Sequence, residues 1–288
     1  MSVIIPTRNR ADDLATTIES LLSQTVQPAE LIIVDQSVEK SYTDSLPIPV
    51  VYIHDRTLSG ASHARNVGMD HARSDIFLFL DDDVVMEANF IEEILAAYSD
   101  GVTGVSGIIT NYQKPNLLRY LWEVAFFRGP FHDDRQPVYW NAARNVASRP
   151  FRVRQFGGGL MSFRRSAVQA HRFDTQLTGA CPGEDVDFCV GLPKESVLLI
   201  NPRARLLHKR SPEGRDSIHW LALQAQVYNY LRQRHWREGF WNNVCFAWLN
   251  VGQMAAAMLA SMKRGSLEPW RSWREGARKG IAIARGET

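Results

Sequence analysis

The chain has 288 residues, of which 45% are hydrophobic and 22% are charged, and its formal net charge is +2. This composition excludes a disordered chain, and the length is sufficient for one large α/β domain, with or without an appendage. A charge so close to zero gives no indication of nucleic-acid binding.

The first third of the chain alternates apolar runs with helical patterns. Leu14, Ile18, Leu21 and Leu22 follow the i, i+4, i+7, i+8 spacing of an amphipathic helix, and residues 64–72 predict a second helix. The apolar runs lack polar alternation, which is typical of parallel strands covered on both faces; they are VII at 3–5, LIIV at 31–34, VVYI at 50–53 and IFLFL at 76–80. We therefore expect an α/β fold with a doubly wound, mostly parallel sheet.

The middle of the chain is less regular. We expect a helix at 88–98 and a strand at 103–110. Residues 111–155 contain four prolines and scattered charge, which predicts an irregular lid or binding loop. After three glycines, residues 156–165 again have a strand-like pattern, and a helix is expected at about 216–235.

Three predicted strands end in polar residues. The first runs into PTRNR at 6–10, the second into Asp35-Gln36-Ser37, and the fourth into Asp81-Asp82-Asp83. Ligands of doubly wound sheets bind at the carboxyl ends of the strands, so these endings predict one shared site.

The three adjacent aspartates repel one another, and a divalent cation removes that repulsion. Carboxylate oxygens suit Mg²⁺ or Mn²⁺. The alternative is a solvated turn in which one aspartate caps the helix near residue 88.

At this point the sequence resembles family 2 glycosyltransferases. The ordered blocks are SVIIPTRNR, LIIVDQS, LSGASHARNVGMDHARSDIFLFLDDDV, FGGGLMSFRR and GEDVDF, which together cover about residues 2–210. The resemblance implies a GT-A fold, Rossmann-like, and an inverting, hexosyltransferase-type enzyme that uses nucleotide-sugar donors.

The same resemblance implies roles for single residues. Asp83 would be the direct metal ligand, and Asp81 would lie nearer the ribose or support the metal. The remaining residues expected to contact the nucleotide-sugar are Pro6, Thr7, Asn9, Asp35, Ser37, Arg65, Asn66, Asp82 and Gly158. Arginine suits phosphate because its guanidinium donates two parallel hydrogen bonds.

The GEDVDF block supplies the acid–base candidates. By resemblance, Asp185 would remove the proton of the acceptor hydroxyl and Glu184 would position the acceptor. As residues alone, Asp187 could replace Asp185, or the acids could simply stabilise a helix N-terminus. His208 follows an apolar strand and would add a third metal ligand, and Lys209 and Arg210 could meet the diphosphate.

The C-terminal region has a different composition. Residues 244–262 contain 15 apolar residues of 19, which approaches the length of a membrane span, although Asn250 and Gln253 share one helix face. Residues 263–285 carry a local charge of +5, and an arc of Trp270, Trp273, Ala277, Ile281 and Ala284 lies beside the arginines. This pattern predicts peripheral contact with an anionic membrane through 244–285, or else a basic helix docked on the catalytic domain.

Location is predicted from two further features. Cys181, Cys189 and Cys245 have no CxxC spacing, which favours reduced thiols in a reducing compartment. The strand-like SVIIP at 2–6 leaves no secretory signal before the fold. We expect a cytoplasmic protein at the inner face of the cell membrane.

Together these features predict a metal-dependent, inverting glycosyltransferase that acts on a glycan or a lipid-linked acceptor in surface polysaccharide biosynthesis. The expected domains are a GT-A domain at 1–212, with a nucleotide-sugar half at about 1–110 and an acceptor half at about 111–212, and a helical region at 213–288. Two alternatives stay open: a haloacid-dehalogenase-like phosphatase using Asp81 and Asp83, and a non-catalytic sugar-nucleotide-binding protein.

Overall fold

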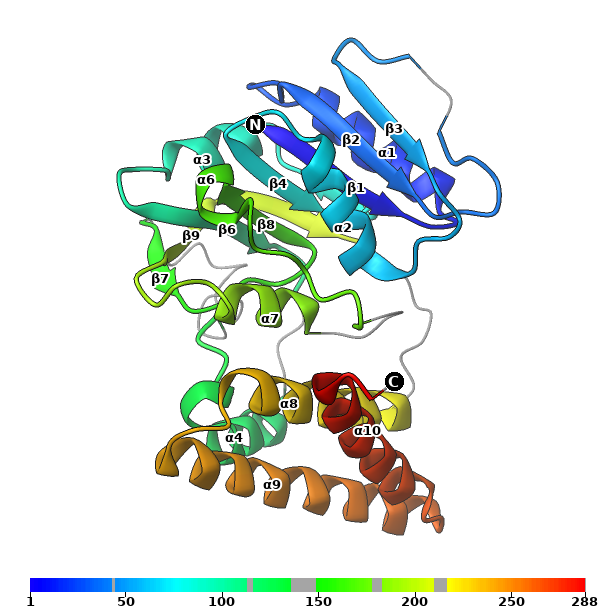
Figure 1. Cartoon of the computed structure of the whole chain (residues 1–288), viewed down its shortest axis with the longest axis vertical. Coiled ribbons are helices and arrows are strands. Elements are labelled where there is room, and N and C mark those ends of the chain that lie inside the picture. Colours follow the sequence, from blue (N-terminus) through cyan, green and yellow to red (C-terminus); the bar gives the residue numbers. More distant parts are fainter. Residues whose placement is uncertain (43–44, 113–115, 136–148, 178–182, 210–216, 288) are drawn as a thin grey trace. The chain divides into compact units, whose positions relative to one another are not determined.

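A computed structural model describes the chain except for residues 43–44, 113–115, 136–148, 178–182, 210–216 and 288 (Figure 1). The chain packs into two compact units. The first consists of residues 1–113, 134–179 and 184–211, and the second of residues 114–133, 180–183 and 212–288. Each unit has hydrophobic clusters of its own.

The first unit is built on one sheet, whose strands within the described residues are β1 (Ser2–Thr7), β2 (Glu30–Asp35), β3 (Val50–His54), β4 (Ile76–Leu80), β5 (Val84–Met86), β6 (Val102–Ile109), β7 (Phe151–Val153), β8 (Leu160–Arg164) and β9 (Val197–His208). Their order is β3-β2-β1-β4-β8-β6-β9-β5, and β7 pairs with β9. Strands β1, β2, β3, β4, β6 and β9 run in one direction, and β5, β7 and β8 run in the other. The sheet is therefore mixed but mostly parallel, which confirms the expected fold class.

Apolar residues cover both faces of this sheet, as the uninterrupted apolar runs predicted. On one face, side chains of β1, β2 and β4 pack against α1 (Ala11–Leu22) and α3 (Phe90–Ala96). On the other face, the alternate side chains of the same strands pack against α2 (Gly60–His71) and α7 (Glu184–Val190). A short helix, α6 (Arg165–Val168), follows β8.

The register brings several chain segments to one edge of the sheet. Thr7 and Asp35 pair at the carboxyl ends of β1 and β2. The end of β4 pairs with the start of β8, Leu80 opposite Leu160, so that Asp81 and Gly159 adjoin. His208, the last residue of β9, pairs with Val84 at the start of β5, directly after Asp83. The strand pairing thus assembles carboxylates, a glycine loop and an imidazole.

The second unit is helical. It contains α4 (Leu117–Phe126), the short 3₁₀ helix η1 (Gly129–Phe131), α8 (Ser217–His235), α9 (Phe240–Arg264) and α10 (Glu268–Arg285). Phe131 of η1 packs with Cys245 and Leu249 of α9. The helices α8, α9 and α10 share a second cluster around Ala225, Ala257 and Trp273.

Two expectations for these regions are wrong. Residues 111–155 are not irregular throughout, because α4 forms within them and packs against α9: Phe126 stacks on Trp248, and the Trp248 indole donates to the Ala125 carbonyl at 2.8 Å. The prolines lie outside the helix, so they do not interrupt it. The segment placed in the acceptor half thus contributes a helix to the second unit, while the division at residue 212 stays a prediction.

The apolar arc of α10 is the second correction. Trp273 is buried in the cluster shared with α8 and α9, and Trp270 and Ala277 are partly buried against it, so the arc does not face wholly outwards. Gly280 allows this close approach, because a methyl group there would collide with the main-chain carbonyl of Gln226 on α8. Helix α10 therefore packs on α8 and α9 within the second unit, and its docking on the catalytic domain stays a prediction.

Among the described residues, one helix is long and apolar enough to cross a membrane, namely α9, with a mean hydropathy of 1.4 in its most apolar window. Only 33% of that window is buried.

Candidate active site

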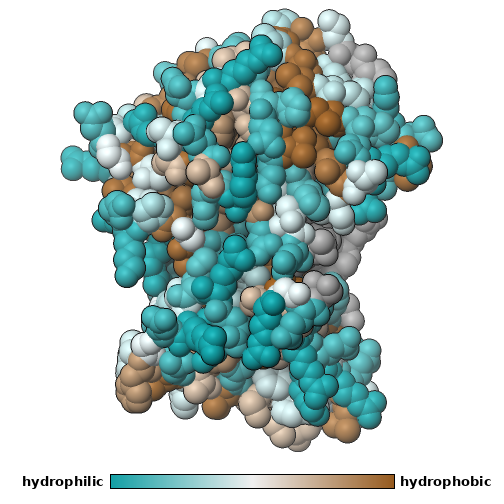
Figure 2. Space-filling model, viewed as in Figure 1, coloured by the Kyte–Doolittle hydropathy of each residue, from teal (hydrophilic) through white to brown (hydrophobic). Residues whose placement is uncertain are grey.

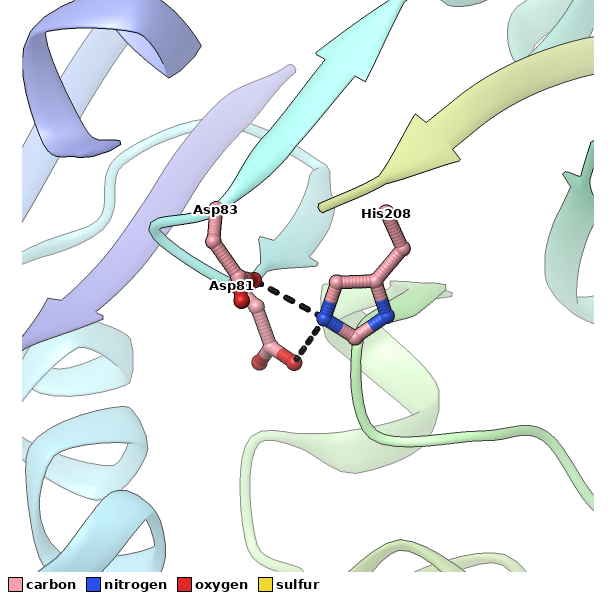
Figure 3. Close-up of side chains that lie close together, drawn as sticks. All are labelled: Asp81, Asp83 and His208. Carbon is pink, nitrogen blue, oxygen red and sulfur yellow. Dashed lines mark ion pairs between the residues drawn. The ribbon is translucent and has the colours of Figure 1, made fainter. Parts of the chain in front are cut away.

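A carboxylate–imidazole cluster lies at the edge of the sheet where β4 and β9 end. Asp81, Asp83 and His208 each offer a ligand atom, and these atoms all lie within 4.8 Å of one another; no other such group occurs in the part of the chain that the structure describes. His208 Nε2 is 2.8 Å from Asp83 Oδ1 and 3.7 Å from Asp81 Oδ2. Figure 3 shows both carboxylates turned towards the same ring nitrogen. Two oxygens and one nitrogen are a suitable partial ligand set for Mn²⁺.

The middle aspartate has a different setting from its neighbours. Asp82 is buried and accepts hydrogen bonds from Thr7 Oγ1 at 2.7 Å and Arg10 Nη1 at 3.3 Å. Burial raises the pKa of Asp82 to about 6, although Thr7 and Arg10 oppose the shift. The hydrogen bond with Thr7 connects the loop after β4 to the end of β1. The main-chain carbonyl of Asp82 also accepts a hydrogen bond from Thr17 Oγ1.

Arg65 connects the metal-ligand candidates to the acid–base candidates. Its side chain is fully buried, and its guanidinium donates to Asp81 Oδ1 at 3.1 Å, Glu184 Oε1 at 2.9 Å and the Gly158 carbonyl at 2.8 Å. The guanidinium also lies over the Phe173 ring, 5.5 Å from its centroid. Arg65 thus links the residue that follows β4 to the first residue of α7. Sequence reasoning predicted a contact of Arg65 with phosphate and did not predict this link.

The two candidate acids at the start of α7 are held differently. Asp185 Oδ2 accepts the Gly158 amide at 2.7 Å. Glu184 faces Arg65, and burial, followed by the charge of Asp185, raises the pKa of Glu184 to about 7. The glycine loop fits closely against them, since a Cβ on Gly158 would lie 3.0 Å from Glu184 Oε1.

The predicted nucleotide residues gather at the ends of β1 and β2. Asn9 has a left-handed backbone with φ of 57°. Its amide donates to Ser37 Oγ at 2.7 Å, and its side chain accepts from the Val38 amide at 3.1 Å. Asp35 accepts hydrogen bonds from the Ser37 and Ser41 amides and the Tyr52 hydroxyl. Pro6 is the buried next-to-last residue of β1.

Other predicted residues are not brought into the cluster. Asn66 pairs through its amide with the main chain of Phe173, at 2.9 and 3.0 Å, and so anchors that loop. Lys209 contacts Thr16 and Asp13 of α1. Arg210 lies outside the described residues.

Sequence reasoning overlooked two residues of the site. Arg10 pairs with Asp82 and Asp83. The available signal was its place in PTRNR, a strand ending that was expected to share one site with the three aspartates. Gly159 entered the sequence analysis only as one of three consecutive glycines, yet a Cβ there would lie 2.9 Å from Asp81 Oδ2. Gly159 lies this close to Asp81 because β4 pairs with β8, and the sequence around residue 159 carries no signal of that pairing.

The geometry supplies two chemical functions side by side. Asp81, Asp83 and His208 can hold a cation, and Asp185 lies across the Gly158 loop as a separate carboxylate. A cation stabilises a departing anionic group, and a carboxylate can accept a proton from an attacking hydroxyl.

Comparison with known proteins gives a family match. The profile described as "Glycosyl transferase family 2" matches residues 2–171. The succinoglycan biosynthesis protein ExoM of Rhizobium meliloti is 25% identical over 284 residues, which are 94% of this chain and 79% of that protein. The glucosyl-dolichyl phosphate glucuronosyltransferase of Haloferax volcanii is 23% identical over 252 residues, 81% of this chain and 76% of that protein.

Solved structures show the same fold. A mannosyltransferase from Pyrobaculum calidifontis in complex with GDP-Man and Mn²⁺ has a TM-score of 0.55 at 18% identity, covering 99% of this chain and 86% of that one. Residues 1–349 of S. aureus TarS with UDP-GlcNAc have a TM-score of 0.60 at 14% identity, covering 98% and 81%. These similarities confirm the GT-A type of fold.

Proposed function

The chain belongs to glycosyl transferase family 2, and we propose that it moves a sugar from a nucleotide-sugar to a glycan or lipid-linked acceptor, with inversion and with a divalent cation. It is a glycosyltransferase, and its relatives support a role in polysaccharide biosynthesis. They give no support to the phosphatase or the non-catalytic alternative.

The observation that carries the proposal is the cluster of Asp81, Asp83 and His208 beside the carboxylate of Asp185. We assign the first three residues to hold Mn²⁺ or Mg²⁺. Such a cation neutralises charge on the leaving nucleoside diphosphate. A structural neighbour carries Mn²⁺ together with a nucleotide-sugar, which agrees with this assignment.

The chain's own residues divide the remaining work. Asp185 accepts the proton of the acceptor hydroxyl, and the Gly158 amide fixes its orientation. Glu184, held by Arg65, positions the acceptor. The ends of β1 and β2, with Asn9, Asp35 and Ser37, form the nucleotide pocket.

We place residues 1–212 as the catalytic region and 213–288 as a helical region at the membrane, on the cytoplasmic side. A lipid-linked acceptor is confined to that surface, so contact through 244–285 brings the enzyme to its substrate. The apolar character of α9 supports this placement.

The test is nucleoside diphosphate release from a panel of nucleotide-sugars with MnCl₂, alone and with candidate acceptors. We expect Asp83→Asn to abolish release and the thermal stabilisation by Mn²⁺ with donor, because a ligand atom is lost. Asp185→Asn should keep that stabilisation and lose transfer. Phosphate release from phosphomonoesters with no turnover of nucleotide-sugars would contradict the proposal.

A further inference from the structure

The helix α9 carries two apolar stripes, one buried and one exposed. Cys245, Leu249, Ala257 and Ser261 lie on the stripe that packs inside the second unit. The opposite stripe is the exposed set of large apolar side chains that we name the α9 face: Phe240, Trp241, Val244, Trp248, Val251, Met254, Met258, Leu259 and Met262. Phe240 is 83% exposed and Met262 is 78% exposed.

The α9 face is longer than a chance group of surface apolar residues. It recurs at the helical period from one end of α9 to the other, about 33 Å at 1.5 Å per residue. Figure 2 shows brown and tan atoms among white and teal ones along the lower edge, where Figure 1 draws α9. Leu118 and Leu121 of α4, the helix that packs against α9, are exposed as well. Contiguous apolar surface of this extent marks an interaction site.

The charge around the α9 face favours an anionic partner. No aspartate or glutamate occurs between residues 239 and 267, whereas Lys263 and Arg264 are exposed at the carboxyl end of α9. A basic border beside aromatic and aliphatic side chains is the pattern that binds anionic lipid surfaces.

An apolar cavity of about 390 Å³ continues the α9 face at the junction with α10. Met258 and Met262 line it from α9, and Leu267 and Trp270 line it from the other side. A cavity lined by methionine, leucine and tryptophan can bind an alkyl chain. A flat protein surface has no such cavity.

We propose that the α9 face docks on the surface of an anionic lipid bilayer, with α9 lying in the plane of the interface. This rests on the membrane contact proposed above, but it assigns the contact to α9 instead of the α10 arc, in which Trp273 is buried and Trp270 and Ala277 are partly buried. It does not depend on the donor chemistry.

A span through the bilayer fits the structure less well. The buried stripe of α9 includes Gln253, whose carbonyl accepts the Trp273 indole of α10 at 3.2 Å. Crossing the membrane would separate α9 from α10, which carries exposed arginines on its other side. Lying parallel to the surface keeps these contacts and buries only the exposed stripe.

The experiment is co-sedimentation of the full-length protein with vesicles of phosphatidylcholine alone or mixed equally with phosphatidylglycerol. We expect binding to the mixed vesicles and a blue shift of tryptophan emission, because Trp241 and Trp248 enter an apolar medium. Phe240→Ser with Met262→Ser should weaken partition by about 100-fold, since two large apolar side chains are lost. Val38→Ser, an exposed apolar residue of the first unit, is the matched control and should bind like the wild type.

Charge variants separate the two helices. Lys263→Glu with Arg264→Glu should weaken binding to mixed vesicles more than to phosphatidylcholine alone. If Arg278→Glu with Lys279→Glu on α10 removes binding while the Phe240/Met262 variant does not, α10 is the lipid contact and the proposal is wrong. If the Phe240/Met262 variant instead halves the mass in solution, a second copy covers the face and the proposal is also wrong.

Nucleoside diphosphate release keeps this test separate from that of the proposed function. The α9-face variants should hydrolyse nucleotide-sugars like the wild type, because the metal-ligand cluster lies in the other unit. They should also melt like the wild type, because the substituted side chains are exposed. Loss of vesicle binding with intact hydrolysis therefore supports the lipid contact by itself. Unchanged vesicle binding overturns it whatever the hydrolysis shows.

Discussion

At the scale of single residues, the acids of the site differ in how the protein stabilises their charge. Burial would raise the pKa of Asp35, but hydrogen bonds from Ser37, Tyr52 and Ser41 outweigh burial and lower it. Glu184 is the opposite case: burial and the charge of Asp185 outweigh the attraction of Arg65, and its pKa rises to about 7. One carboxylate is thus stabilised as an anion and the other as a neutral acid.

This difference predicts how stability depends on pH. The pKa of Glu184 in the folded protein lies above its ordinary value of 4.5. The contribution of Glu184 to the stability of the fold is therefore fully present below pH 4.5 and is lost as the pH rises through about 7. Glu184→Gln cannot ionise, so its melting temperature should gain about 3 °C or more relative to the wild type between pH 5 and pH 8.

Thermal melts of both proteins across this pH range measure the effect. Glu275→Gln, at an exposed position of α10, is the control and should follow the wild type. Melting curves of Glu184→Gln that stay parallel to the wild type at every pH would show that the ionisation of Glu184 does not couple to folding.

At the scale of elements, the two glycines just before β8 allow the side chains of the site to lie close to the main chain. Gly158 and Gly159 lie between the end of β4 and the start of α7, with no room for side chains. A Cβ on Gly159 would lie 2.9 Å from Asp81 Oδ2 and 3.3 Å from His208 Cε1, whereas one on Gly158 would meet Glu184 and Arg65. The two adjacent glycines therefore serve different halves of the site.

Alanine substitutions should separate these halves. We expect Gly159→Ala to weaken Mn²⁺ binding by about 10-fold or more, because it displaces two ligand candidates. Gly158→Ala should keep Mn²⁺ affinity and slow transfer to the acceptor. Calorimetric titration with MnCl₂, followed by transfer assays, measures both effects, and equal losses in the two variants would contradict the division.

At the scale of the whole molecule, each unit has its own core. The sheet unit holds the metal-ligand candidates, and the helical unit holds the α9 face. Seven of the eight tryptophans, all except Trp140, lie in the ranges of the helical unit, so tryptophan fluorescence reports that unit almost alone.

This distribution allows the two units to be followed separately. Mn²⁺ with UDP or GDP should raise the unfolding transition seen by circular dichroism, because ligand binding stabilises the sheet unit. The transition seen by tryptophan fluorescence should move less. Asp83→Asn should remove the shift, and equal shifts by both probes in the wild type would show that the units unfold as one.

Most of the sheet could be predicted from the sequence, because uninterrupted apolar runs allow few arrangements other than strands covered on both faces. The polar strand ends could be predicted as one site because the carboxyl ends of parallel strands meet at one edge of the sheet. Helix α4 was missed because its apolar residues lie among prolines and charges, and its packing partner, α9, is over a hundred residues away.

By itself, the sequence determined the chemistry of the chain: which residues can bind a cation, accept a proton or enter an apolar surface. The tertiary structure decided which of them meet. Arg65 is a bridge between Asp81 and Glu184 because three distant segments converge on it. Trp273 of α10 is buried and the outer stripe of α9 is exposed because each helix can turn only one face towards the other helices of the unit.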